Sequence, residues 1–343
     1  MKTQWNLTDS RCDLDRFGSR RELLELMEGF DGIELMHYEE DDRELLAPEM
    51  VIGYHMSLPE YWLDFWRGDL NRVEQEFDTL DRAYGYYGGR TPDALVQAVK
   101  REYENALHYQ AEYMVFHVSD AGAWEEMTGQ YHHTDREVID GACELLNAAL
   151  PERVAPDRGF LQSGPGIAPE QSGSGAGPLL LLENLWQPGL TMTDPEMTLR
   201  LLDGIRYPAK GIMLDTGHLM HTNLSLRTQK EALAYIHRML EEHADLCRYI
   251  RGVHLNQSLT GSVMRRYQKN PPEQGADYEE RMNQLFTYIF QVDLHRPFVC
   301  TGVGALIHRI NPDYVTFEFI SRNLNEHRQM LRRQQNALKS PGI

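Results

Sequence analysis

The stretch GIMLDTGHLMHTN, residues 211–223, combines residue types that can do chemistry at a useful spacing. It opens with a short apolar run that has the length and composition of a buried strand. The run ends on Asp215, and His218 follows three residues later. A carboxylate and an imidazole in that position are costly to remove from water without a partner. A divalent metal ion is one natural partner, and an N-cap aspartate beside a solvated histidine is the alternative.

The elements that would position these side chains can be read from the rest of the sequence. Short apolar runs typical of strands lie at 3–7, 32–38, 50–57, 113–120, 179–186, 211–218, 249–256 and 314–319. Helical patterns separate or follow most of them, at 19–30, 91–110, 135–150, 226–246 and 320–337. Alternating strands and helices indicate a parallel sheet, and eight of them in one domain length predict a (β/α)8 barrel, an α/β fold. We therefore expect a single domain over residues 1–343.

In such a barrel the carboxyl ends of the strands and the loops after them carry the chemistry. Six of the eight predicted strands finish on a residue that can bind a metal. These residues are His55, His117, Glu183, Asp215 (with His218 beyond it), His254 and Glu318. Because the strand ends meet at one face, the set predicts a metal centre there.

Composition bounds the class of protein. The 343 residues are 41% hydrophobic and 25% charged, which is typical of a soluble globular protein with a sizeable core. No signal peptide or membrane-spanning run is recognisable, and the four cysteines form no C-x-x-C pair, so we expect free thiols, a cytoplasmic protein and no membrane partner. The formal charge of −18 speaks against a generally nucleic-acid-binding surface but allows a local basic groove or bound cations.

Other segments invite simpler interpretations. The low-complexity segment 163–178 is expected to be a flexible surface loop at the opposite end of the barrel. His37 is expected to be a satisfied polar residue near the rim, and His221 to cap or pair rather than to ligate. His132 and His133 are expected to be solvated in a loop.

Four segments, LLLENLW, MLDTGHL, GVHLN and TFEF, resemble in this order the xylose isomerase-like barrel superfamily. That superfamily includes sugar isomerases and epimerases and the endonuclease IV group of abasic-site nucleases. The resemblance spans nearly the whole chain. In the isomerase and epimerase branch it implies one divalent metal, held here by Glu183, Asp215, His254 and Glu318.

The endonuclease IV branch implies a three-zinc cluster in which Glu183 would bridge two metals. By order and strand position, the five further ligands would be His55, His117, His218, Asp293 and His295. Two departures stand out. The Asp293–His295 pair follows an inserted segment, 258–290, and the loops with which that branch grips DNA are not recognisable. The insertion carries the small basic cluster Arg265, Arg266 and Lys269.

These observations favour a divalent-metal-dependent hydrolase of phosphoesters that resembles endonuclease IV and acts on DNA of the abasic-site type. Zinc is the expected metal, with up to three ions and manganese as an alternative, and Glu183 and Glu318 are the expected catalytic residues. The alternative is a one-metal sugar isomerase or epimerase, in which the same two glutamates shuttle a proton. A third interpretation is a metal-binding barrel without turnover. The substrate, a small molecule or a nucleic acid, and the oligomeric state stay open.

Overall fold

A computed structural model describes residues 1–41, 43–152 and 177–339, and these form a closed barrel of eight parallel strands. The strands pair in chain order, and β8 closes the barrel against β1. Their bounds are β1 Lys2–Thr8, β2 Gly32–Met36, β3 Val51–His55, β4 Tyr113–His117, β5 Leu179–Glu183, β6 Lys210–Asp215, β7 Ile250–His254 and β8 Tyr314–Phe317. The predicted single-domain (β/α)8 barrel is confirmed.

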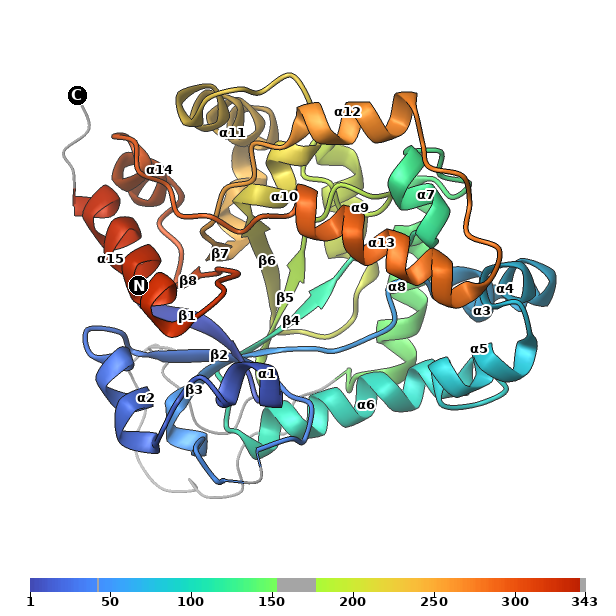
Figure 1. Cartoon of the computed structure of the whole chain (residues 1–343), viewed down its shortest axis with the longest axis horizontal. Helices are drawn as coiled ribbons and strands as arrows, with labels where there is room; N and C mark the ends of the chain where they lie inside the picture. The colour runs from blue at the N-terminus through green and yellow to red at the C-terminus, as the bar shows by residue number, and fades with distance from the viewer. Residues whose placement is uncertain (42, 153–176, 340–343) are drawn as a thin grey trace, which may run out of the picture.

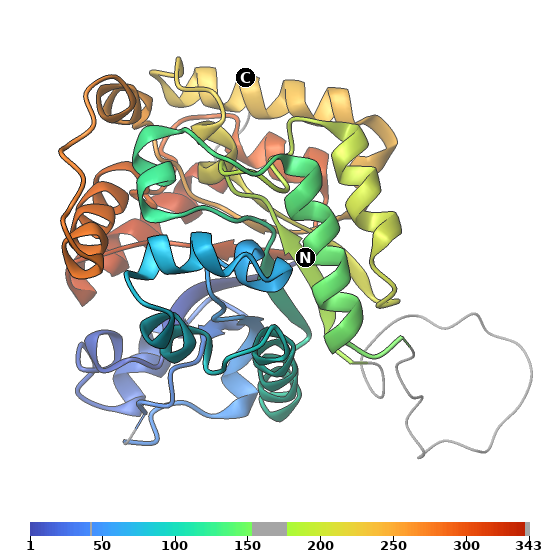
Figure 2. The ribbon, with the colours of Figure 1, turned by 90° about the vertical axis from the view of Figure 1, so that its right-hand side faces the viewer.

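Helices cover the outside of the barrel, and short helices lie within the connections between strands (Figure 1). They are α1 Arg11–Leu14, α2 Arg20–Met27, α3 Leu63–Arg67, α4 Leu70–Phe77, α5 Leu80–Tyr87, α6 Asp93–His108, α7 Ala123–Thr128, α8 Asp135–Ala149, α9 Pro195–Gly204, α10 Thr216–His221, α11 Gln229–His243, α12 Gly261–Lys269, α13 Tyr278–Val292, α14 Val303–Ile310 and α15 Leu324–Lys339. Single 3₁₀ segments lie at Pro48–Met50 and Ala244–Tyr249. Figure 2 shows α6 and α8 side by side on the flank of the barrel, where they pack against each other.

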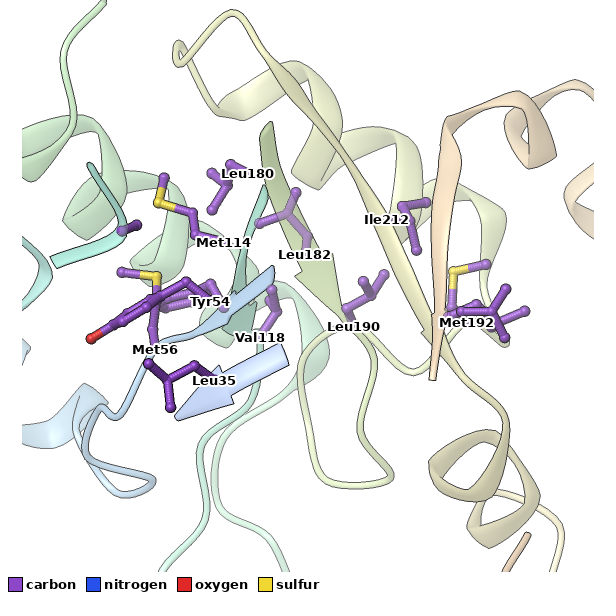
Figure 3. Packing of buried hydrophobic residues seen from close by; sticks show 14 of the residues in the cluster. Leu35, Tyr54, Met56, Met114, Val118, Leu180, Leu182, Leu190, Met192 and Ile212 are labelled. Carbon is purple, nitrogen blue, oxygen red and sulfur yellow. The ribbon is translucent and has the colours of Figure 1, made fainter. Parts of the chain in front are cut away.

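The alternation of side chains along the strands divides the core into two layers. Met114, Leu180, Leu182 and Ile212 belong to the large outer layer, between the strands and the helices (Figure 3). Their neighbours in the sequence, Tyr113, Val115, Leu181 and Met213, form a separate small cluster. Because side chains two residues apart share a face, this inner row continues into the donor residues at the ends of β4, β5 and β6. This inner apolar cluster therefore lies directly next to the donor residues inside the barrel.

The inserted segment forms α12 and α13, which pack against α7 (Figure 1). Met127 of α7, Met264 of α12 and Tyr288 and Val292 of α13 share one buried cluster. At the base of this excursion, the backbone N–H groups of Gln257 and Arg296 donate to each other's carbonyls at 2.8 and 3.0 Å. The insertion therefore leaves the barrel and returns to it at the same place, beside the end of β7.

Two sequence expectations bear on the periphery. Residues 163–176, the greater part of the segment expected to be a flexible loop, lie outside the described residues. In the part of the chain that the structure does describe, no helix combines the length and the apolar character needed to cross a membrane.

Candidate metal centre

All six predicted strand-end donors occupy one end of the barrel. His55, His117, Glu183, Asp215 and His254 are the last residues of their strands, and Glu318 comes directly after β8. The registers His117 to Glu183 and Asp215 to His254 place neighbouring donors side by side. The closed parallel barrel therefore turns donors from distant parts of the chain into one cluster.

Glu183 lies at the centre of this cluster and is fully buried. Its Oε2 lies 3.3 Å from Nε2 of His55 and 3.3 Å from Nε2 of His117. Its Oε1 lies 3.0 Å from Nδ1 of His254 and 3.3 Å from Nδ1 of His218. Donors of a tetrahedral zinc ion stand about 3.3 Å apart, from a bond length near 2.05 Å. The distances from the imidazole nitrogens to the oxygens of Glu183 are thus close to the distance between two donors of one metal ion.

Asp215 is fixed by the residues around it. Its Oδ1 accepts from the backbone N–H of His218 at 2.6 Å, and its Oδ2 accepts from Nδ2 of Asn256 at 2.6 Å. Asn184 clamps the backbone of Asp215, accepting from its N–H at 2.9 Å and donating to its carbonyl at 3.1 Å. These contacts hold the carboxylate at the start of α10 with little freedom to rotate.

The insertion brings Asp293 and His295 back to this cluster, although they follow His254 by some forty positions in the sequence. Asp293 caps the end of α13, and its Oδ2 lies 3.5 Å from Nε2 of His218 and 3.4 Å from Nε2 of His295. The hydroxyl of Ser258 accepts from the backbone N–H groups of Leu294 and His295 at 2.9 and 3.2 Å. The backbone hydrogen bonds between Gln257 and Arg296, together with these contacts, return the chain to the end of β7 after the long insertion.

His295 carries two signs of a functional position. Its φ of 43° lies in the left-handed region, which is unfavourable for a side chain with a Cβ and is tolerated mainly at functional sites. Its Nδ1 and Nε2 are both buried, and neither has a hydrogen-bond partner among the described residues. Asp293 and Glu318 lie near Nε2 without hydrogen-bonding to it. A buried imidazole without hydrogen bonds is costly, and a bound cation would supply one of the missing interactions.

The electrostatics also indicate a missing cation. Burial raises the pKa of Glu318 well above its ordinary value, and the charges of Asp215 and Glu183 raise it further against the opposing effect of His254. Burial alone would lower the pKa of His254, but the charges of Glu183, Glu318 and Glu34 raise it well above its ordinary value. The negative charge of the carboxylates in the centre thus exceeds the positive charge that its imidazoles supply. Divalent ions would balance this excess.

The donor atoms fall into groups whose members lie within 4.8 Å of one another. One group is His55, His117 and Glu183; a second is Glu183, Asp215, His254 and Glu318; a third is Asp215, His218 and His295, beside which Asp293 lies. All nine residues singled out from the sequence are thus brought together. These buried clusters could bind metal ions.

Glu34 of β2 was missed by the sequence reasoning. It is 2% exposed, lies 2.9 Å from Nε2 of His254 through Oε1, and accepts from the hydroxyl of Thr316 at 2.9 Å and from that of Tyr113. Burial alone would raise the pKa of Glu34, but the charge and hydrogen bond of His254, together with His55 and Tyr113, lower this pKa below its ordinary value, which keeps the carboxylate ionised. The available signal was a glutamate in the middle of the apolar run GIELM, which is costly without a partner.

The other histidines singled out from the sequence have local partners. Nδ1 of His37 lies 2.5 Å from Asp9, and Nε2 of His221 lies 3.1 Å from the carbonyl of Val292. The expectation that His132 and His133 are solvated was wrong. Both pair with Asp64 of α3, and the side chain of His133 is only 8% exposed.

A family model described as "Xylose isomerase-like TIM barrel" matches residues 24–291. The chain belongs to this family. The match covers every strand of the barrel except β1 and β8, and it extends through the insertion nearly to Asp293.

Solved structures of this fold resemble the xylose isomerase-like chain at low sequence identity. D-allulose 3-epimerase from Methylomonas sp. is 12% identical with a TM-score of 0.50, and the match covers 99% of this chain and 97% of that one. The 3-keto-D-glucoside 4-epimerase YcjR from E. coli is 12% identical with a TM-score of 0.46, covering 98% and 99%. The IOLI protein, crystallised with a zinc atom, is 13% identical with a TM-score of 0.43, covering 98% and 96%. Curated protein sequences gave no match.

Proposed function

We propose that this xylose isomerase-like barrel is a metal-dependent phosphoester hydrolase of the endonuclease IV type, with DNA containing an abasic site as its substrate. The observation that carries the proposal is the gathering of eight donors into three adjoining groups that share Glu183 and Asp215, with a ninth donor, Asp293, beside the third group. An isomerase with one metal needs only the middle group. His55 and His117 on one side, and His218, Asp293 and His295 on the other, make sense as ligands of two further ions.

The residues fit the proposed ions by type as well as by position. Imidazole and carboxylate donors without cysteine suit zinc, with manganese as the alternative. Divalent ions in such a cluster would supply Lewis-acid stabilisation of phosphate oxygens and an acidified water molecule. Glu183, in the shared position, would hold two ions at a fixed separation. His295 would satisfy one of its two nitrogens that lack a hydrogen bond by binding the third ion.

Exposure defines the side from which a substrate can reach the centre. The side chain of His117 is 25% exposed, more than that of any other candidate ligand, and Glu318 follows at 13%. Glu318 lies between His254 and His295, with Oε2 3.3 and 3.7 Å from their nitrogens. We assign to Glu318 the acceptance of a proton at the rim of the centre, and to Glu183 the fixing of the donors behind it.

The test combines a metal count with an activity assay. The purified chain is stripped with a chelator, reloaded with zinc, and analysed for ions per chain. It is then assayed on a duplex with one abasic site and on a panel of ketoses. We expect three ions in the centre and cleavage of the duplex. Asp293→Asn should lose one ion and the cleavage activity, and Asp135→Asn, a carboxylate that accepts from Gly189 outside the centre, should retain both.

Two outcomes would contradict the proposal. One ion in the centre of the reloaded chain, together with conversion of a ketose, would assign the protein to the isomerase and epimerase class. Three ions without turnover of either substrate would leave a metal-binding barrel.

A further inference from the structure

A second cluster of metal-binding side chains lies outside the barrel centre. Asp64 in the first turn of α3 faces two adjacent histidines in the loop between α7 and α8. Its Oδ2 lies 2.9 Å from Nε2 of His132, and its Oδ1 lies 3.1 Å from Nε2 of His133. The three donor atoms all lie within 4.8 Å of one another. None of these residues contributes to the centre described above.

A fourth donor, Asp120, comes from the loop after β4. Its Oδ1 accepts from the backbone N–H groups of Trp62 and Leu63 at 2.7 and 2.8 Å. Its Oδ2 is buried, has no hydrogen-bond partner among the described residues, and lies 4.0 Å from Nε2 of His133. Asp120 as a whole is 1% exposed. A carboxylate oxygen left alone at such depth is costly, and a cation beside it would remove that cost.

The surroundings orient the donors. The hydroxyl of Tyr61 donates to Oδ2 of Asp64 at 2.6 Å, and Oε1 of Glu125 pairs with Nδ1 of His132. A carboxylate on one ring nitrogen, with the other nitrogen turned toward the site, is the arrangement that accompanies metal-bound histidines. The side chain of His132 is 18% exposed, which leaves an entry path for an ion from solvent.

We propose that Asp64, Asp120, His132 and His133 form a second, structural site for a divalent cation of the zinc class. Imidazole and carboxylate groups are both zinc ligands, and four of them match the number of donors in a closed tetrahedral site. The charges of one divalent ion and two carboxylates cancel. The paired donors, at 2.9, 3.1 and 4.0 Å, lie near the spacing of about 3.3 Å that zinc requires.

An ion bound at this site would join three segments: α3, the loop after β4, and the loop before α8. Asp120 lies in the loop after β4, three residues beyond His117. An ion here would therefore stiffen the chain next to the exposed rim of the barrel centre. The competing explanation is a cluster of ion pairs between aspartates and protonated imidazoles, which needs no metal.

The test uses the full chain, stripped with a chelator and reloaded with zinc alone. Asp120→Asn keeps an oxygen for the N–H groups of Trp62 and Leu63 and removes only the charge at Oδ2. His133→Asn removes one imidazole donor. His37→Asn is the matched control, because His37 also pairs with a buried aspartate, Asp9, but belongs to no group of candidate metal donors among the described residues.

We expect Asp120→Asn and His133→Asn each to retain one ion fewer per chain than the unchanged protein, and His37→Asn to retain all of them. Zinc should also raise the unfolding temperature of the unchanged chain by more than that of Asp120→Asn. Equal ion counts in Asp120→Asn and the unchanged protein would overturn the proposal in favour of ion pairs. If His133→Asn does not fold, Asp120→Asn decides alone. Because the comparison is a difference of one ion, it holds whether the barrel centre binds one ion or three.

Discussion

Nε2 of His254 lies 2.9 Å from Oε1 of Glu34, on the side of the imidazole ring opposite to Glu183. The barrel centre thus has a carboxylate that holds a candidate ligand by its other nitrogen. In metal proteins such a partner fixes the ring orientation and raises the basicity of the donor.

Replacing Glu34 by Gln should weaken zinc binding in the centre by about 10–100-fold, because the amide keeps the size of the side chain but not its charge. Competition with a chromophoric chelator measures the affinity. Asp135→Asn, a carboxylate away from the centre, should bind zinc like the unchanged protein. An unaltered affinity in Glu34→Gln would show that Glu34 serves only the packing of the barrel.

Gly217 in α10 leaves room for Asn256, whose Nδ2 donates to Asp215. A Cβ at Gly217 would lie 2.0 Å from Oδ1 of Asn256, so Gly217→Ala must displace the amide and loosen Asp215. We expect a loss of metal affinity and of about 1–3 kcal/mol in the free energy of unfolding.

The control for this substitution is Gly85→Ala in α5, where a Cβ would meet nothing within 4 Å. Alanine in that helix interior should stabilise the protein by about 0.5–1 kcal/mol. Urea unfolding of both variants, with and without zinc, checks the pair. If the two variants behaved alike, the tight contact at Asn256 would not restrain Asp215.

His327 on α15 predicts an acid-sensitive stability. It packs edge-on against Trp5 with 5.0 Å between ring centroids, and burial lowers its pKa to about 3. The unfolded chain takes up the proton near pH 6.5, whereas the folded chain resists it. The contribution of His327 is therefore complete above pH 6.5 and is lost as the pH falls toward 3.

Between these limits the free energy of unfolding should fall about 1.4 kcal/mol per pH unit more steeply in the unchanged protein than in His327→Phe. Urea unfolding of both proteins, stripped of metal, at several pH values from 7 to 4 gives the two slopes. Parallel slopes would mean that His327 is protonated in the folded state.

Arg265 and Arg266 on α12 are exposed. Because the formal net charge of the chain is −18, contact with DNA phosphates would depend on such local positive side chains. We expect weak duplex binding with a steep salt dependence. Each replacement by Ala should reduce the slope of log affinity against log salt by about 0.9. The control is Arg206→Ala, since Arg206 lies before β6 at the opposite end of the barrel. Slopes that are the same in all three variants would exclude α12 from the DNA contact.

The sequence predicted the barrel well because its strands are short apolar runs, six of which end on or directly before a residue that can bind a metal. The six strand-end donors follow from that pattern alone. The Asp64 cluster did not, because its members come from a helix and two loops whose packing has no periodic signal. Glu34 was overlooked for a different reason: a lone glutamate inside β2 acquires its meaning only from His254, which ends β7, five strands later in the chain.

The two backbone hydrogen bonds between Gln257 and Arg296 carry a consequence for recognising relatives of this protein. Since they anchor both ends of the excursion, its length can change without moving Asp293 and His295, just as a long surface loop costs little more than a short one. The spacing from His254 to the D-x-H pair is then a freely variable quantity. A motif search that fixes this spacing would discard proteins with the same centre, whereas one that anchors the pair to the residues of the closing bridge would retain them.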